Sequence, residues 1–273
     1  MKLDRRAIER FFADGIVFPV RAFGADEAGE WHERLKRIEA QRAGRLPPAS
    51  NAKPHLLVPW LWEIVHDARV VDAVEALLGP DLLCWGSSLI IKEPEDGRYV
   101  AWHQDATYWG LSVPEAVTAW IAFTPSVQEN GCVRVVPGTH RTQREHFDTR
   151  DAKNLLGRQE SLVEDVDEAT AVDVVLQPGE TSLHHVLIVH GSRPNSSKLR
   201  RVGFAVRYIS ARNGQGGGPR NSATLVRGRD YGTFDLERAP EAEFHPAAMA
   251  RHATVLRRSM ATIFGSPAER PKR

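Results

Sequence analysis

The sequence has little of what marks a secreted, membrane-spanning or nucleic-acid-binding protein. It contains two cysteines, Cys84 and Cys132, which are too few for a disulfide framework. No run of 18 apolar residues is present, so we expect no membrane span. Lys and Arg number 36 against 35 Asp and Glu, a net charge of +1 that predicts no nucleic-acid surface. The first residues, Met1 to Arg6, lead into a charged helical pattern in place of an apolar signal sequence, and we expect a cytoplasmic protein.

What is present indicates helices first and strands afterwards. Apolar residues at helical spacing predict helices over 4–13, 25–42 and 68–78, with Gly15 and Gly79 at two of their ends. Short apolar runs between turn residues predict the strands that follow, over 82–92, 117–123, 132–136, 171–176, 181–189 and 200–210. This order predicts a mainly β protein, a sandwich or barrel with N-terminal helices against one face.

The stretch from Trp102 to Asp105 carries the first chemical signal. If it is extended, His103 and Asp105 leave the same face of a strand, because strand side chains alternate. A second histidine would complete a 2-His-1-carboxylate triad, which holds Fe(II) and leaves coordination positions open. His190, at the end of an apolar run, is the best candidate. The His-x-Asp pair is a weak signal by itself, because most such pairs are a surface histidine beside a solvated aspartate.

Arg201 carries the second signal, eleven residues after His190 and at the start of an apolar strand. A buried guanidinium is costly unless it meets an anion, and its planar fork suits a carboxylate. A metal triad followed by a carboxylate-binding arginine is the arrangement that an Fe(II)/2-oxoglutarate oxygenase requires. Arg200 is the first alternative for this contact.

With these residues in place, the chain resembles the phytanoyl-CoA dioxygenase family over residues 5–210. The resemblance lies in several motifs that occur in order: Trp102-His103-Gln104-Asp105; Ala119-Trp120-Ile121-Ala122; Asn130-Gly131 through Pro137-Gly138-Thr139-His140; Leu176-Gln177-Pro178-Gly179-Glu180; and His190-Gly191-Ser192 with Asn195 and Arg201. Each motif is common by itself, but together they are specific.

The resemblance implies a double-stranded β-helix core, the cupin-like jelly roll, within one oxygenase domain over 1–265. That domain would comprise a helical part over 1–80, the core over about 82–210 and a C-terminal extension over 211–265, followed by a disordered tail over 266–273. It also implies a hydroxylase that uses Fe(II), 2-oxoglutarate and dioxygen and releases succinate and CO2.

The resemblance assigns site residues as well. Fe(II) would be held by His103, Asp105 and His190. The residues expected at 2-oxoglutarate are Arg201, Ser192, Trp120, Ser88 and, by a loose match to an upstream lysine of the family, Lys53. The presence of the acidic ligand Asp105 argues against halogenation, for which the family carries a small residue at this position.

The substrate is less well defined by the sequence. The candidate contacts are Tyr108, Trp109, His185 and Arg207. Of His184 and His185 at most one can face the site, because neighbours on a strand point to opposite sides. Ordinary core packing for the two aromatics, and a buried acidic partner for Arg207, stay open. No basic cluster fits a CoA phosphate, so we expect a small polar or anionic metabolite as the partner; the oligomeric state stays open.

Two further alternatives remain at this point. A non-oxidative jelly-roll protein, either a cupin-like isomerase or a small-molecule binding module, would need a metal only as a Lewis acid or not at all. The polar segments 45–57 and 141–168 are either lids over the site or plain surface connections. As lids, they would bring Lys53, His55, His146 or Asn154 to the substrate.

Overall fold

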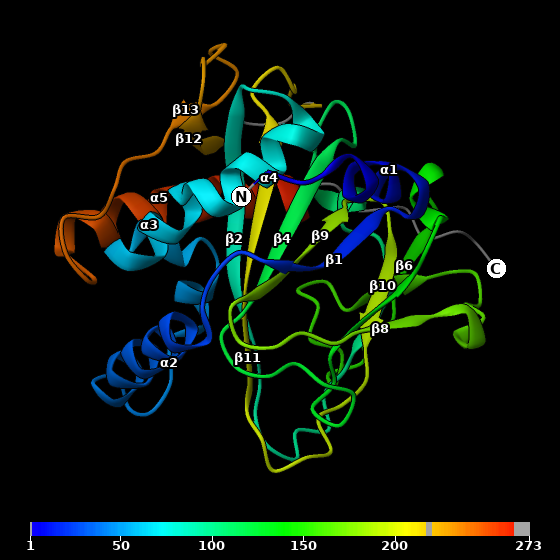
Figure 1. The fold of residues 1–273 in the computed structure, drawn as a ribbon. Helices are drawn as coiled ribbons and strands as arrows, with labels where there is room; N and C mark the ends of the chain where they lie inside the picture. The colour runs from blue at the N-terminus through cyan, green and yellow to red at the C-terminus, as the bar shows by residue number, and fades with distance from the viewer. Residues whose placement is uncertain (1, 217–219, 265–273) are drawn as a thin grey trace.

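The computed structural model describes residues 2–216 and 220–264 and contains two antiparallel β-sheets that face each other (Figure 1). The larger sheet has the order β1-β9-β4-β11-β2-β12-β13, where β12 and β13 alone pair in parallel. The smaller sheet has the order β3-β10-β5-β8, and β6 and β7 form a separate hairpin. The strands are β1 (Ile16–Arg21), β2 (Leu82–Lys92), β3 (Val100–His103), β4 (Ala116–Ala122), β5 (Val133–Val136), β6 (His146–Asp148), β7 (Glu160–Leu162), β8 (Val172–Val174), β9 (Glu180–His185), β10 (Val189–Ser192), β11 (Arg201–Ser210), β12 (Ser222–Arg227) and β13 (Asp235–Leu236).

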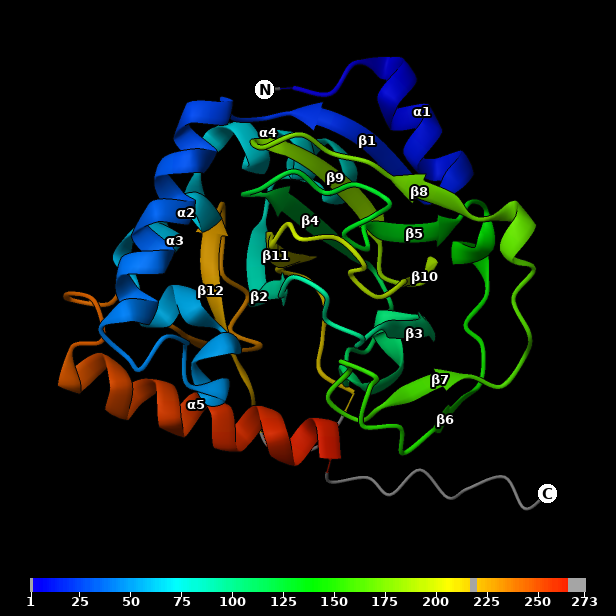
Figure 2. The same ribbon diagram turned by 90° about the horizontal axis from the view of Figure 1, so that it is seen from below.

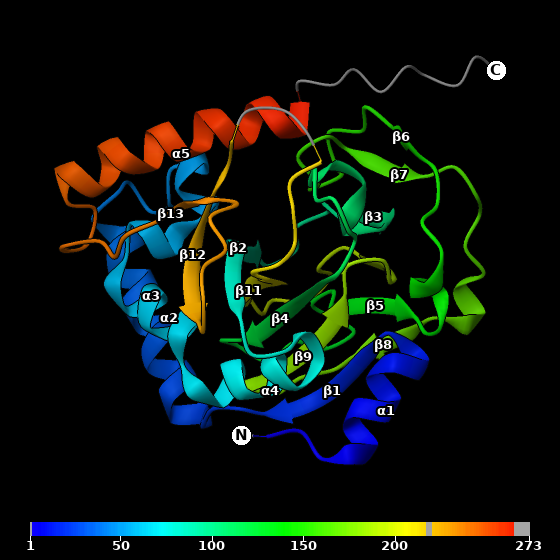
Figure 3. The same cartoon turned by 90° about the horizontal axis from the view of Figure 1, so that it is seen from above.

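Helices cover the outer side of the larger sheet, while the smaller sheet lies on its inner side (Figures 2 and 3). The helices are α1 (Arg5–Asp14), α2 (Ala25–Ala40), α3 (Pro59–His66), α4 (Ala68–Leu78) and α5 (Pro246–Phe264), with 3-10 turns η1 (Pro48–Asn51), η2 (Pro54–Leu56), η3 (Asp105–Tyr108), η4 (Thr139–Arg141) and η5 (Glu168–Thr170). This arrangement confirms the expected jelly-roll core with N-terminal helices.

Side-chain alternation along β4 separates the two faces of the larger sheet. Val117, Ala119 and Ile121 pack into the cluster beneath the helices. Trp120 and Ala122 pack inward, against residues of the smaller sheet. All seven residues of β4 are buried, because both faces of the strand are covered. The inward row is the one that reaches the candidate site.

The helix boundaries follow from local chemistry. Asp4 caps α1 by accepting a hydrogen bond from the Ala7 amide, and Gly15 ends the helix in the left-handed region with φ of 80°. Asp67 caps α4 in the same way. The helices predicted over 4–13, 25–42 and 68–78 are therefore confirmed within two residues.

Several elements differ from the sequence-based expectation. The run 181–189 is divided between β9 and β10, in different sheets, because the chain turns at Val186 to Ile188. The larger sheet also extends past the expected core limits of 82–210, through β1 at one edge and β12 and β13 at the other. The expected disordered tail over 266–273 lies outside the described residues. No helix among those described is long and apolar enough to cross a bilayer.

A buried ion pair joins the segment before α3 to the segment after β12. Lys53 Nζ lies 2.5 Å from Glu237 Oε1 and donates to the Ser222 carbonyl. The other oxygen of Glu237 accepts from Thr224, which also contacts His55. Burial raises the pKa of Glu237, but the charge of Lys53 and the contact with His55 outweigh it and lower that pKa to about 2. This cluster fastens the 45–57 segment to the C-terminal extension.

We expect Glu237→Gln to lower the free energy of unfolding by about 3–5 kcal/mol at pH 7, because it leaves Lys53 as an unpaired buried charge. Glu237 has a lowered folded pKa, so its contribution is complete above its ordinary value of 4.5 and is lost as pH falls toward about 2. Urea unfolding across this pH range measures the effect. Exposed Glu63→Gln is the control, and equal unfolding free energies for both variants would contradict the prediction.

Candidate metal centre

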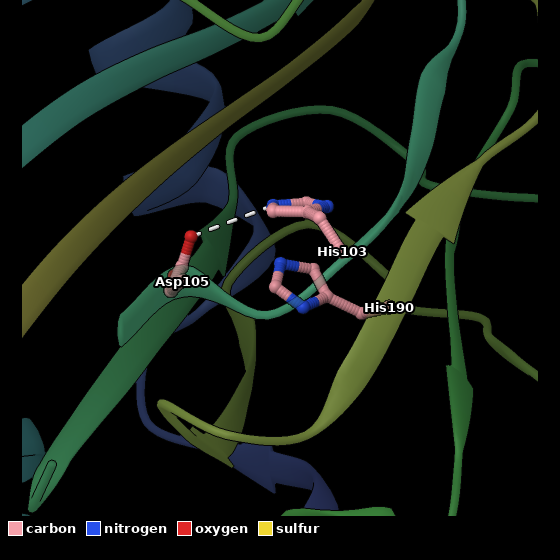
Figure 4. Close-up of side chains that lie close together, drawn as sticks. All are labelled: His103, Asp105 and His190. Atoms are coloured by element: carbon pink, nitrogen blue, oxygen red, sulfur yellow. Dashed lines mark ion pairs between the residues drawn. The ribbon is translucent and has the colours of Figure 1, made fainter. Parts of the chain in front are cut away.

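The structure brings His103, Asp105 and His190 together between the two sheets. His190 on β10 lies directly opposite His103 on β3 in the strand register, with ring centroids 4.1 Å apart. One ligand atom from each of the three residues lies within 4.8 Å of the other two, and His103 Nε2 is 3.5 Å from Asp105 Oδ1 (Figure 4). Among the residues described, this is the only such group of three or more histidine, cysteine or acidic side chains.

The local geometry behind this convergence differs from the expectation. His103 is the last residue of β3, and Asp105 is the first residue of η3, so the two do not share one face of a continuous strand. Gln104, between them, is extended and buried. The carboxylate reaches the histidines because the chain turns after Gln104.

Gln104 holds this corner in place, a role that the sequence analysis missed. Its side-chain amide donates to the carbonyls of Thr142 and Leu187 and accepts from the Arg144 amide. Its backbone amide donates to His146 Nε2 at 2.9 Å. The signal in the sequence was a polar residue between two candidate ligands, which needs its own partners if it is buried.

Backbone carbonyls orient both histidine rings. His103 Nδ1 lies 2.9 Å from the Ala101 carbonyl, and His190 Nδ1 lies 3.0 Å from the Ile188 carbonyl. A carbonyl only accepts, so each Nδ1 carries the proton and each Nε2 presents a lone pair. The two Nε2 atoms and the carboxylate thus form a set of three metal donors.

The charges of these groups also suit a divalent cation. Burial lowers the pKa of His190 to about 3, assisted by His103, so this imidazole is neutral at pH 7. Burial opposes ionisation of Asp105, but the adjacent side chain of His103 and the positive charge of Arg207 hold its pKa well below the usual range. Two imidazoles and one carboxylate are the donors of a non-haem Fe(II) facial triad, so the residues present fit that metal.

A cavity of about 130 Å³ adjoins the three ligands and contains three expected cofactor-binding residues, Trp120, Ser192 and Arg201. Within the described part of the chain, Trp120 Nε1, Ser192 Oγ and Arg201 Nε are buried without a hydrogen-bond partner. The Arg201 guanidinium lies 5.5 Å from the Trp120 ring and donates to the Gly131 carbonyl. Unpaired buried donors of this kind fit a carboxylate ligand.

Gly203 makes room for this wall of the cavity. A Cβ atom at Gly203 would lie 2.1 Å from Cζ2 of Trp120, so the indole occupies the space that any larger residue would fill. The bare backbone of β11 at this point leaves room for Trp120, whose ring lies 5.5 Å from the Arg201 guanidinium. The glycine therefore shapes the cavity through Trp120, although it does not line the cavity itself.

The other expected cofactor contacts lie elsewhere. Ser88 Oγ accepts from Arg207 at 3.0 Å, and Ser88 is not among the residues that line the cavity. Lys53 is paired with Glu237 and is absent from the residues found to line the cavity. The structure does not bring Lys53 to this site, because its ammonium group is held by Glu237 and the Ser222 carbonyl.

The expected substrate contacts divide in the same way. Arg207 lines the cavity, and its guanidinium lies 5.7 Å from the ring of Trp109, which is buried against Trp85. His184 lines the cavity, whereas His185 points away and packs against Phe11 and His140. His184 thus takes the place expected for His185. The side chain of Tyr108 lies outside the part that the structure describes.

Of the two expected lids, only the 141–168 segment reaches the cavity. It contributes Leu155 and Leu156 to the lining. Asn154 is buried beside them, and its side chain bonds to the Ala101 amide and the Glu160 carbonyl. His146, on β6, contacts the backbone of Gln104 and does not line the cavity. The 45–57 segment packs against β2 and the C-terminal extension.

Comparisons with known proteins agree with this geometry. The family model described as Phytanoyl-CoA dioxygenase (PhyH) matches residues 11–203. A probable alpha-ketoglutarate-dependent hypophosphite dioxygenase of Stutzerimonas stutzeri is 26% identical over 185 residues, 67% of this chain and 60% of that protein. The chain spans about half the length of the curated relatives it matches.

Two solved structures resemble the whole described fold. The apo form of ThoJ, a non-heme monooxygenase, is 38% identical with a TM-score of 0.84, over 94% of this chain and 97% of that one. CytC3 with Fe(II) and alpha-ketoglutarate is 26% identical with a TM-score of 0.66, over 89% of this chain and 96% of that one.

Proposed function

The chain belongs to the phytanoyl-CoA dioxygenase family of Fe(II)/2-oxoglutarate-dependent oxygenases, and from that premise we propose that it hydroxylates an unactivated C–H bond of a small polar metabolite. The observation that carries this proposal is the set of three converging donors next to a cavity with the unpaired Arg201 Nε and Ser192 Oγ. The non-oxidative alternative is set aside, because the family is one of oxygenases.

His103, Asp105 and His190 would hold Fe(II) next to the cavity that all three residues line. Fe(II) with bound 2-oxoglutarate supplies dioxygen activation and C–H oxidation, and the co-substrate leaves as succinate and CO2. The Nδ1–carbonyl contacts orient both histidine rings so that their Nε2 atoms face the place of the metal. Asp105 stays ionised at neutral pH and supplies the negative charge of the site.

Arg201, Ser192 and Trp120 would hold the distal carboxylate of 2-oxoglutarate. Each of the three offers a buried donor atom without a partner among the described residues. Arg201 is 1% exposed, so its contact with a carboxylate would be screened little by water. Leu155 and Leu156 give the cavity an apolar part of its lining, which would help to exclude water from the reacting groups.

A succinate-release screen tests the proposal. Purified protein with Fe(II), 2-oxoglutarate and dioxygen is given a panel of small carboxylates, phosphonates, amino acids and neutral polar compounds. We expect at least one compound to raise succinate release in equal amount to a product that is one oxygen atom heavier. The His103→Ala variant should release none. A turnover product without the added oxygen would contradict hydroxylation.

A second buried side chain that can carry a positive charge, Lys92, neighbours Arg201, although it is not among the residues that line the cavity. It is fully buried on β2, opposite Arg201 in the strand register, and its ammonium group donates to the Arg193 carbonyl. No carboxylate oxygen in the described ranges lies within 4.0 Å of either cation. Burial lowers the pKa of Lys92 to about 7. Smaller influences come from Arg201 and Arg98, which lower this pKa, and from Asp96 and Cys132, which raise it.

We therefore expect 2-oxoglutarate affinity to fall as pH rises above about 7. A bound carboxylate favours the charged form of Lys92, so binding takes up a proton, and less is gained once Lys92 is neutral in the free protein. If bound 2-oxoglutarate raises the pKa of Lys92 by about one unit, the Kd of 2-oxoglutarate is roughly tenfold weaker at pH 9 than at pH 6. Calorimetry in buffers of different ionisation enthalpy measures both quantities.

Lys92→Met should remove most of this pH dependence, while Lys198→Met, an exposed lysine on the loop before β11, should keep it. Methionine preserves the apolar stem of the side chain, so the core next to Arg201 stays filled. An unchanged pH profile in Lys92→Met would show that another group takes up the proton.

A further inference from the structure

A row of polar side chains crosses the inner face of the larger sheet, two residues along from Trp120. Arg207 on β11 is registered opposite Thr118 on β4, and Thr118 is registered opposite His184 on β9. All three line the cavity of the metal centre. The next row consists of Ala205, Trp120 and Ser182. The Arg207–Thr118–His184 row and the Ala205–Trp120 row therefore both contribute to the lining of the same cavity.

Arg207 forms no ion pair with a carboxylate among the described residues, although its charge acts on Asp105 of the metal centre. Within the ranges that the structure describes, no carboxylate oxygen comes within 4.0 Å of its guanidinium, which donates to Ser88 Oγ and lies over Trp109. Apart from Arg201, other arginines of low exposure are paired: Arg134 with Glu168, Arg158 with Asp148 and Arg200 with Glu39. Ser88 and Trp109 hold the Arg207 guanidinium without neutralising it.

The two neighbours of Arg207 in this row, Thr118 and His184, also have unsatisfied polar atoms among the described residues. Thr118 Oγ1 and His184 Nδ1 are buried without a hydrogen-bond partner among the described residues. Thr118 is 2% exposed and His184 is 3% exposed. A buried polar atom that lacks a partner is costly, and two of them lie beside one unpaired guanidinium on a single row. A ligand with two or three oxygens at one end would satisfy all three side chains.

This row lies apart from the proposed 2-oxoglutarate anchor. Arg207 and Arg201 are six residues apart on β11, roughly 20 Å along an extended strand. His184 adjoins the metal ligands, with its ring 5.3 Å from that of His190. The row therefore lies beside the metal ligands, where a substrate with an anionic end would meet Arg207.

We propose that Arg207, Thr118 and His184 form a substrate subsite for an oxyanion, either a carboxylate or a phosphonate, next to the carbon that is oxidised. This proposal rests on the function proposed above and names its substrate class. Arg207 supplies the charge, Thr118 supplies a hydroxyl donor, and His184 takes the position that the sequence analysis gave to His185. The small cavity favours a short carbon chain.

Calorimetry with defined probes tests the subsite. Propionate, ethylphosphonate and the neutral propionamide are titrated into protein loaded anaerobically with Fe(II) and 2-oxoglutarate. We expect one of the oxyanions to bind at least about tenfold more tightly than propionamide, as a charge-assisted contact implies. Which oxyanion binds more tightly distinguishes a carboxylate substrate from a phosphonate. Equal binding of all three probes would overturn the proposal.

Matched variants assign the effect to the row. Arg207→Gln should reduce the oxyanion preference about tenfold or more and change the Kd of 2-oxoglutarate less than about threefold. Arg207→Lys should restore part of the preference, and Thr118→Val should weaken oxyanion binding without a change in charge. Arg212→Gln, an exposed arginine just after β11, is the control for folding and net charge.

Two outcomes separate this subsite from the proposed function. If Arg207→Gln weakens 2-oxoglutarate and leaves the probes unaffected, Arg207 belongs to the co-substrate site and the proposal is wrong. If wild-type protein fails to bind 2-oxoglutarate, the proposed function fails, whereas the oxyanion preference of the metal-free protein still tests the row. An unchanged preference in both Arg207→Gln and Thr118→Val would overturn the subsite.

Discussion

Replacement of His190 by alanine is expected to abolish Fe(II) binding at micromolar metal. The three donors come from separate places, β10, the end of β3 and the start of η3, and no fourth metal-binding side chain joins their group among the described residues. Loss of one donor leaves an imidazole and a carboxylate. We expect Fe(II) affinity to fall by more than ~100-fold, because loss of a group that only hydrogen-bonds to a metal ligand already lowers metal affinity about 10–100-fold. The same result is expected for His103→Ala.

The measurement is the weak visible charge-transfer band that Fe(II) and 2-oxoglutarate give together under anaerobic conditions. Wild-type protein should show the band, and both variants should lack it. His245→Ala, a half-exposed histidine just before α5, should keep it and serves as the control for folding. Retention of the band in His103→Ala or His190→Ala would refute the ligand assignment.

The sequence was sufficient to select the three side chains that converge in the structure, although the local geometry expected for two of them was wrong. His103 and Asp105 were expected to share one face of a strand, but the strand ends at His103 and Asp105 begins a 3-10 turn. The residues converge because Gln104 is anchored by contacts with Thr142 and Leu187, far away in the sequence. Such long-range hydrogen bonds leave no periodic signal in the chain.

The differences between the expected and the observed lining on the substrate side have a similar cause. His184 and His185 are adjacent, so the sequence limits the choice to one of them but does not say which faces the cavity. The register of β9 against β4 decides it, because His184 pairs with inward-facing Thr118. Lys53 was placed by a loose match, and its partner Glu237 comes from a part of the chain beyond the family resemblance.

The elements that were not predicted lie mainly at the edges of the fold. Strand β1 contains a proline and pairs only with β9, so its pattern resembles a connection between two helices. Strand β12 follows a Gly-rich stretch and was assigned to an extension. Central strands β2, β4 and β11 were predicted well, because burial on both faces requires nearly continuous apolar runs.

Arg201→Met is expected to weaken 2-oxoglutarate binding roughly 10–150-fold, because a charge-assisted contact contributes about 1.5–3 kcal/mol and each 1.4 kcal/mol is about tenfold. Iron binding should change little, since Arg201 is not among the metal donors. Calorimetric titration of 2-oxoglutarate with protein loaded anaerobically with Fe(II) measures the loss.

The neighbouring Arg200 offers a matched control with the opposite pattern. Its guanidinium pairs with Glu39 at 2.7 Å and with Glu93 at 2.9 Å, on the helix side of the sheet. Arg200→Met should therefore lower the free energy of unfolding and leave 2-oxoglutarate affinity unchanged. Arg201→Met should do the reverse, because it removes a buried cation that has Lys92 opposite it and no carboxylate partner in the described ranges. If Arg200→Met weakens 2-oxoglutarate and Arg201→Met does not, the anchor is Arg200.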